Sequence, residues 1–130
     1  MSTRELTLAD FEQTVSGEGI VLVDFWAAWC GPCRQFAPVY EKASEDNPDI
    51  VFGKVDTEAE RELSASAQIM SIPTLMAFRQ GILVFEQAGA LPAPALEQVI
   101  QAVRDLDIDD VHRQLAEQQA TAEAQEGATR

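Results

Sequence analysis

The sequence has few basic residues, with nine lysines and arginines against 22 aspartates and glutamates in 130 residues. The formal net charge is therefore −13 at pH 7. Nucleic acids and anionic membranes attract basic surfaces, so we expect neither as a partner. The chain also has only one histidine, His112, and two cysteines, which is too few ligands for a structural zinc site. It has no glycine-rich nucleotide-binding motif, and we expect no bound cofactor.

Long apolar runs are missing too. The longest run is interrupted by Asp24 after a few residues, which is too short to cross a membrane. The first six residues lack the basic-then-apolar order of a secretory signal, so the expected location is the cytoplasm. Two cysteines suit that reducing compartment, where stable structural disulfides are unusual. The length allows one ordinary domain, and an apolar share of 46% indicates that it folds.

The apolar pattern predicts alternating strands and helices. Residues 20–25 and 50–56 are rich in β-branched and aromatic side chains, as in strands buried on both faces of a sheet. The short link 79–81 contains a glycine and can only join two antiparallel strands, 74–78 and 82–85. A weak strand is expected at residues 5–6, and helices near residues 10–15, 33–46, 58–68 and 96–103. The class is α/β, with a mixed sheet covered by helices on both faces.

The last part of the chain differs from the rest, so we divide it into a domain over residues 1–106 and an acidic extension over residues 107–130. Ile108, Val111 and Leu115 are spaced to line one face of a short helix. No large apolar residue follows Leu115, and residues 118–130 are polar and alanine-rich. We expect this final stretch to be disordered.

The two cysteines lie together in Trp29-Cys30-Gly31-Pro32-Cys33, where a predicted strand gives way to a predicted helix. Free N–H groups and the dipole at a helix N-terminus favour thiolate at Cys30, whereas Cys33 lies one turn further in and is more shielded. Cys30 is then the attacking thiol, and Cys33 resolves the mixed disulfide. A purely structural disulfide is the alternative, but so small a loop would gain little chain entropy.

Asp24 is the second informative residue, because it interrupts an apolar strand. A buried carboxylate costs free energy unless it is paired, hydrogen-bonded or protonated, so burial should raise its pKa toward neutrality. Asp24 would be exposed instead if it ended the strand. The apolar run continues through Phe25 and Trp26, which favours burial.

At this point the chain resembles the thioredoxin family, bacterial type, over about residues 4–106. Four motifs occur in the family's order: residues 23–33, Lys54, residues 72–74 and residues 88–91. The resemblance implies a thioredoxin fold, a central mixed five-stranded sheet flanked by four helices. Ala88 and Ser71 depart from the family's usual residues, a larger apolar residue and a glycine, and the extension lies outside the pattern.

The resemblance also assigns roles to residues. It implies that Asp24 is a general acid and base that exchanges a proton with Cys33, and that Lys54 partly offsets the burial of Asp24. It implies a cis peptide bond before Pro73, which leaves the backbone of Ile72 free to bind an extended substrate segment. The expected substrate-binding residues are Trp29, Gly31, Pro32, Ile72, Pro73, Gly89 and Ala90.

The activity that the resemblance implies is reduction of protein disulfides. The electrons would come from a thioredoxin reductase that uses FAD and NADPH. They would pass to substrates such as peroxiredoxins, ribonucleotide reductase and methionine sulfoxide reductases, with the protein acting as a monomer. A disulfide oxidase or isomerase is one alternative, although Gly31-Pro32 lacks the histidine usual between the cysteines of oxidants. A scaffold or chaperone subunit is another, but it would not need Cys30, Cys33, Asp24 or Pro73.

Overall fold

The protein is described by a computed structural model that covers residues 2–128, with side chains up to residue 124. Within those residues it has five strands and five helices, and their succession confirms the predicted order up to the last helix. The elements are β1 (Thr3–Glu5), α1 (Leu8–Val15), β2 (Ile20–Trp26), α2 (Gly31–Asp46), β3 (Val51–Asp56), α3 (Arg61–Ser66), β4 (Thr74–Arg79), β5 (Ile82–Ala88), α4 (Ala93–Asp105) and α5 (Ile108–Ala128).

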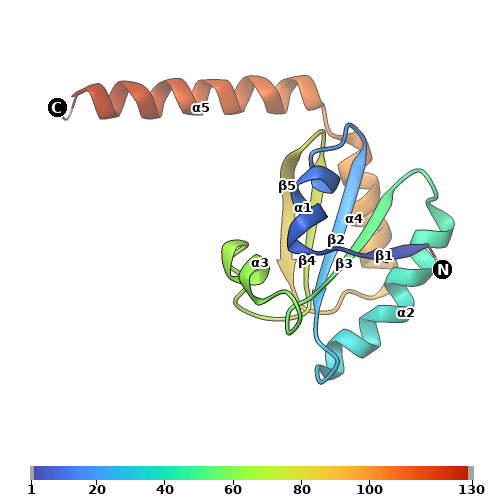
Figure 1. The fold of residues 1–130 in the computed structure, drawn as a ribbon. Helices are drawn as coiled ribbons and strands as arrows, with labels where there is room; N and C mark the ends of the chain where they lie inside the picture. Colours follow the sequence, from blue (N-terminus) through green and yellow to red (C-terminus); the bar gives the residue numbers. More distant parts are fainter. Residues whose placement is uncertain (1, 129–130) are drawn as a thin grey trace.

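The five strands form one mixed sheet in the order β1-β3-β2-β4-β5. Strands β1, β3 and β2 run parallel, whereas β4 runs antiparallel to β2 and forms a hairpin with β5. Helices α2 and α4 cover one face of the sheet, and α1 and α3 cover the other (Figure 1). The predicted mixed sheet with helices on both faces is therefore confirmed.

Successive side chains along each strand point to opposite faces of the sheet, which divides the core into two halves. On the α2–α4 side, Leu22 of β2 and Leu75 of β4 pack with Tyr40 of α2. On the α1–α3 side, Phe25 of β2 and Met76 of β4 form the centre of the second half. Strand β2 is buried on both faces because it lies in the middle of the sheet, so its run of apolar residues needs no polar face.

The expectation for the extension was a short helix followed by disorder over residues 118–130, of which residues 129–130 lie outside the described part of the chain. Helix α5 instead continues to Ala128, although every described side chain from His112 to Ala124 is exposed. Alanine, glutamine and glutamate have high helix propensity, so this stretch is helical without packing against a core. Figure 1 shows α5 extending from the body at the end opposite the β2–α2 loop.

The N-terminal part of α5 contacts the β4–β5 hairpin. The Asp107 carboxylate accepts a hydrogen bond from the Asp110 N–H at 3.1 Å, and the His112 ring lies 3.3 Å from the amide oxygen of Gln80. The Arg79 guanidinium donates to the carbonyl oxygen of Val103 at 3.0 Å, at the end of α4. The first two contacts involve the start of α5 and the third holds the end of α4, and none of them involves the residues beyond His112.

We predict that a chain shortened to residues 1–107 keeps the fold. The loss removes two partly buried apolar side chains, Ile108 and Val111, and should lower the free energy of unfolding by about 2 kcal/mol. Urea unfolding of both chains measures this difference. The rate of disulfide reduction should be unchanged, and a shortened chain that fails to fold would show that α5 belongs to the domain.

Candidate active site

Cys30 and Cys33 form a disulfide at the N-terminus of α2, with their Cα atoms 5.2 Å apart. Strand β2 ends at Trp26, and Cys30 is the N-cap residue of α2, with Pro32 in the first turn. Proline fits there because the first helical N–H groups have no partner within the helix. The N–H of Cys33 donates to the Cys30 sulfur at 3.2 Å. The first sulfur therefore receives the hydrogen bond that would stabilise a thiolate.

Exposure does not distinguish the two sulfurs as expected. Cys30 is 4% exposed and Cys33 is 3% exposed in this disulfide form. The difference lies in their surroundings, since Cys30 lines a surface groove, whereas Cys33 lines a separate cavity that also contains Lys54. Cys30 is therefore the outer cysteine because it lines the surface groove, and not because it is more exposed.

The groove beside Cys30 has a volume of about 440 Å³ and is mostly apolar. Trp29 and Met70 line this groove with 67% and 94% of their surface exposed, which is unusual for such large apolar side chains. The Cys30 sulfur lies 3.7 Å from the carbonyl oxygen of Ile72. Of the residues predicted to bind substrate, the groove brings together Trp29, Gly31, Pro32 and Ile72.

The other predicted binding residues lie outside the groove lining. The Ile72–Pro73 bond is cis, as the resemblance implied, but Pro73 itself is buried. The N–H of Gly89 donates to the Pro73 carbonyl oxygen at 2.8 Å, and its φ of 104° is one that glycine adopts readily. Gly89 and Ala90 are exposed next to this contact. Among the described residues, no backbone hydrogen bond uses the N–H or C=O of Ile72.

Two residues of the groove region were not predicted. The Trp29 indole N–H donates to Glu58 at 3.1 Å, and Glu58 also pairs with Arg61 at 3.2 Å, so the indole is held at the rim. Glu58 is 29 positions away in the sequence, and no local pattern indicates this contact. Met70 precedes the Ile72–Pro73 motif by two residues, and this proximity in the sequence could have indicated that it lies at the groove.

Asp24 is buried, and both of its carboxylate oxygens lack a hydrogen-bond partner among the described residues. Burial raises the pKa of Asp24 to about 7, with Lys54 opposing the rise and Glu5 adding to it. Strand β2 continues to Trp26, so the alternative of an exposed strand end is wrong. A carboxyl group in this state can hold or release a proton near neutral pH.

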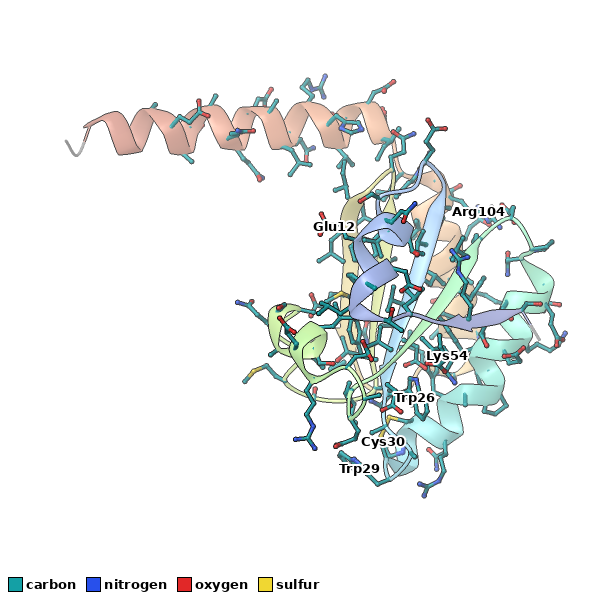
Figure 2. All side chains as sticks on the ribbon, in the orientation of Figure 1. Glu12, Trp26, Trp29, Cys30, Lys54 and Arg104 are labelled. Carbon is teal, nitrogen blue, oxygen red and sulfur yellow. A yellow bond between two sulfur atoms is a disulfide. The ribbon has the colours of Figure 1, made fainter. Side chains whose placement is uncertain are left out.

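Lys54 connects Asp24 with the cysteines. It is the register partner of Asp24 on the neighbouring strand, and its ammonium lies 4.8 Å from the centre of the Trp26 ring. Lys54, Trp26 and Cys33 line one cavity of about 250 Å³. Figure 2 shows Trp26, Trp29 and Cys30 at the same end of the molecule, with Lys54 just above Trp26.

Within the part of the chain that the structure describes, no three histidine, cysteine, aspartate or glutamate side chains are grouped as metal ligands. In the same residues, no helix combines the length and the apolar character that a membrane span requires.

A disulfide at the start of a helix that follows a central strand, with a cis-proline beside it, defines the class of dithiol–disulfide oxidoreductases. Comparison with known proteins agrees, since the family model named Thioredoxin matches residues 2–102. A Streptomyces coelicolor protein provisionally named thioredoxin 2 is 60% identical over 121 residues, covering 93% of this chain and 90% of the relative. The chain belongs to the thioredoxin family.

Two further relatives support this assignment. The thioredoxin of Alicyclobacillus acidocaldarius is 44% identical over 97 residues, which cover 74% of this chain and 92% of the relative. The solved structure of Plasmodium falciparum thioredoxin superposes with a TM-score of 0.71 at 37% identity, covering 76% of this chain and 97% of that one. The protein is thus a protein-disulfide oxidoreductase whose redox group is the Cys30–Cys33 disulfide.

The Streptomyces relative also bears on α5. Its alignment leaves at most nine of the 130 residues outside, so the aligned part must extend at least to Thr121. Most of α5 therefore has a counterpart in that relative.

Proposed function

We propose that the protein acts as a disulfide reductase, with Cys30 as nucleophile and Cys33 as resolving thiol. The Cys30 thiolate attacks one sulfur of a substrate disulfide, and the other substrate sulfur leaves as a thiolate that takes up a proton. Cys33 then gives up its proton and attacks the Cys30 sulfur, which releases the second substrate thiol. Two electrons pass to the substrate, and the Cys30–Cys33 disulfide forms.

The observation that carries this proposal is the hydrogen bond from the Cys33 N–H to the Cys30 sulfur at the mouth of the groove. It stabilises negative charge on the sulfur that a substrate can reach. In the resolving step the Cys30 sulfur is the one that Cys33 attacks, and the substrate thiolate is the leaving group.

Asp24 and Lys54 supply the proton chemistry of the resolving step in this proposal. Cys33 must lose a proton before it attacks, and a carboxylate with a pKa of about 7 is a suitable acceptor. The cavity shared by Cys33 and Lys54 is large enough for water, which would pass the proton between the thiol and the buried carboxyl group. Asp24 would then be the general base, with Lys54 stabilising its charged form.

The groove suggests how substrates bind. An extended segment next to its disulfide would lie against Trp29, Gly31, Pro32 and Ile72, with hydrogen bonds to the unpaired Ile72 backbone. Pro73 would support this strand from below, and Gly89 and Ala90 would flank it. We propose a monomer acting in the cytoplasm, with residues 1–106 as the catalytic domain and residues 107–130 as an extension.

The partners we propose are those implied by membership of the family. Electrons would come from a thioredoxin reductase that carries FAD and uses NADPH. The substrates would include peroxiredoxins, ribonucleotide reductase and methionine sulfoxide reductases.

The reduction potential of the Cys30–Cys33 pair tests the direction of the reaction. Equilibration in dithiothreitol or glutathione buffers should give a value more negative than the cytosolic glutathione pool, which lies at about −220 to −260 mV. A clearly more positive value would favour an oxidase or isomerase instead. Absence of a reversible transition would leave a scaffold role.

We predict that Met70 contributes to substrate affinity. Met70→Ala should lower kcat/KM about fivefold for peptide disulfides that carry an apolar residue beside the cysteine, because about 1 kcal/mol of apolar contact is lost. The measurement is the initial rate of peptide disulfide reduction with excess dithiothreitol. A peptide with serine at the same place should show little change.

The matched control is Leu8→Ala, which removes another exposed apolar side chain, 48% exposed, on α1 outside the groove. Its rates should equal those of the unmodified protein. Equal losses in both variants would show that Met70 acts through general stability rather than through the groove.

A further inference from the structure

Three charged side chains lie in one row across the sheet. Glu5 of β1 is in register with Lys54 of β3, and Lys54 is in register with Asp24 of β2. Registered residues of neighbouring strands point to the same face, so the three side chains stand side by side with the lysine in the middle. The lysine therefore lies between two carboxyl groups, and its charge lowers the pKa of each.

The two carboxyl groups differ in their access to solvent. Asp24 is 1% exposed, whereas Glu5 is exposed on the edge strand β1. Partial burial raises the pKa of Glu5, with Lys54 and the Trp26 indole lowering it and Asp56 raising it. The Trp26 N–H has no partner at hydrogen-bond distance among the described residues, so it does not fix the Glu5 carboxylate. The main attraction on Glu5 comes from the lysine.

We propose that Glu5 is a positioning residue that competes with Asp24 for the ammonium of Lys54, and thereby controls when Asp24 holds or releases its proton. A negative charge at Glu5 repels a charge on Asp24 and draws the Lys54 ammonium toward the sheet edge. Both effects favour protonated Asp24. The consequence for turnover rests on the proposed role of Asp24 in the resolving step.

No other described group offers the same control. Tyr40 of α2 faces Asp24, but burial and the nearby carboxyl group raise its pKa well above the usual range, and its hydroxyl donates to the Gly53 carbonyl oxygen. Leu75 is the register partner on β4 and carries no charge. Asp56 and Glu41 interact with Glu5 and with Lys54, respectively, and neither contributes to the pKa of Asp24. Cys33 lines the Lys54 cavity and is bonded to Cys30.

The test is the titration of the Asp24 carboxyl carbon by NMR in the oxidised protein. Glu5→Gln should lower the Asp24 midpoint by about half a pH unit, as expected for charges two strand spacings, or about 10 Å, apart. Glu5→Asp retains the charge and should stay near the unmodified protein. Glu5→Ser removes the charge without adding an amide and should shift the midpoint in the same direction as Glu5→Gln.

Glu12→Gln is the matched control, because it removes the same charge from an exposed position on α1, on the other side of the sheet (Figure 2). Its Asp24 midpoint should be unchanged. An unchanged midpoint in folded Glu5→Gln and Glu5→Ser, or an equal shift in Glu12→Gln, would overturn the proposal.

A second measurement separates this proposal from the proposed function. The pH profile of the resolving step should shift in Glu5→Gln in the same direction as the carboxyl titration. If only the carboxyl titration shifts, the proposed effect of Glu5 on Asp24 is supported, and the proposed role of Asp24 in turnover is wrong.

Discussion

Replacing Cys30 by serine is expected to abolish disulfide reduction, with a loss of at least about three orders of magnitude, because no other thiol meets the groove. Cys33→Ser should lose turnover as well, but for a different reason. Its Cys30 thiolate still receives the backbone N–H bond from position 33, and it still attacks the substrate. With no resolving thiol, the mixed disulfide accumulates.

Mass spectrometry distinguishes the two variants. After incubation with a peptide disulfide, Cys33→Ser should carry one covalently bound peptide and Cys30→Ser none. Both variants lose the same disulfide, so their urea unfolding curves serve as the control for stability. A stable adduct on Cys30→Ser instead would reverse the assignment of nucleophile and resolving thiol.

Asp24→Asn is expected to stabilise the oxidised protein at neutral and alkaline pH. The pKa of Asp24 is about 7 in the folded state against 3.8 for a free carboxyl group, so the unfolded chain releases this proton first. The stability associated with protonated Asp24 is complete below pH 3.8 and is lost as the pH rises through about 7. At about 1.4 kcal/mol per pH unit, this interval corresponds to about 4 kcal/mol.

The quantity to measure is the difference in unfolding free energy between Asp24→Asn and the unmodified protein, by urea at several pH values. This difference should grow by about 4 kcal/mol between about pH 3 and pH 8, and most of the growth should fall between the two pKa values. The part of this free-energy difference that does not depend on pH includes the cost of burying an amide without a hydrogen-bond partner. Glu12→Gln, at an exposed site on α1, should show no comparable growth. A flat difference for Asp24→Asn would mean that Asp24 has the same pKa in the folded and unfolded states.

Much of this site was predictable because it is local in the sequence. The strand over residues 20–25, the cysteine pair and the helix that follows are contiguous, so their patterns indicate a disulfide at a helix N-terminus. Asp24 was noticeable because a carboxylate is costly inside an apolar run. The strand order around it follows from short connections and the hairpin at residues 79–81.

The missed features depend on contacts between distant residues or on propensity alone. The hydrogen bond between Trp29 and Glu58 and the row from Glu5 to Asp24 exist only because of the sheet register and the loop after β3. Cys30 and Cys33 are almost equally buried in the disulfide form, a packing property that their positions along a helix do not determine. Helix α5 was underestimated because the expectation required apolar packing, which alanine-rich helices do not need.

The direction of α5 has a practical consequence for attachment chemistry. The helix has 21 residues and thus a length of about 30 Å, and it leaves the body at the end opposite the thiols. A fluorophore, a bead or a fused protein joined near its exposed outer turns would be held away from the groove. The protein can therefore be immobilised through α5 with its disulfide facing the solution.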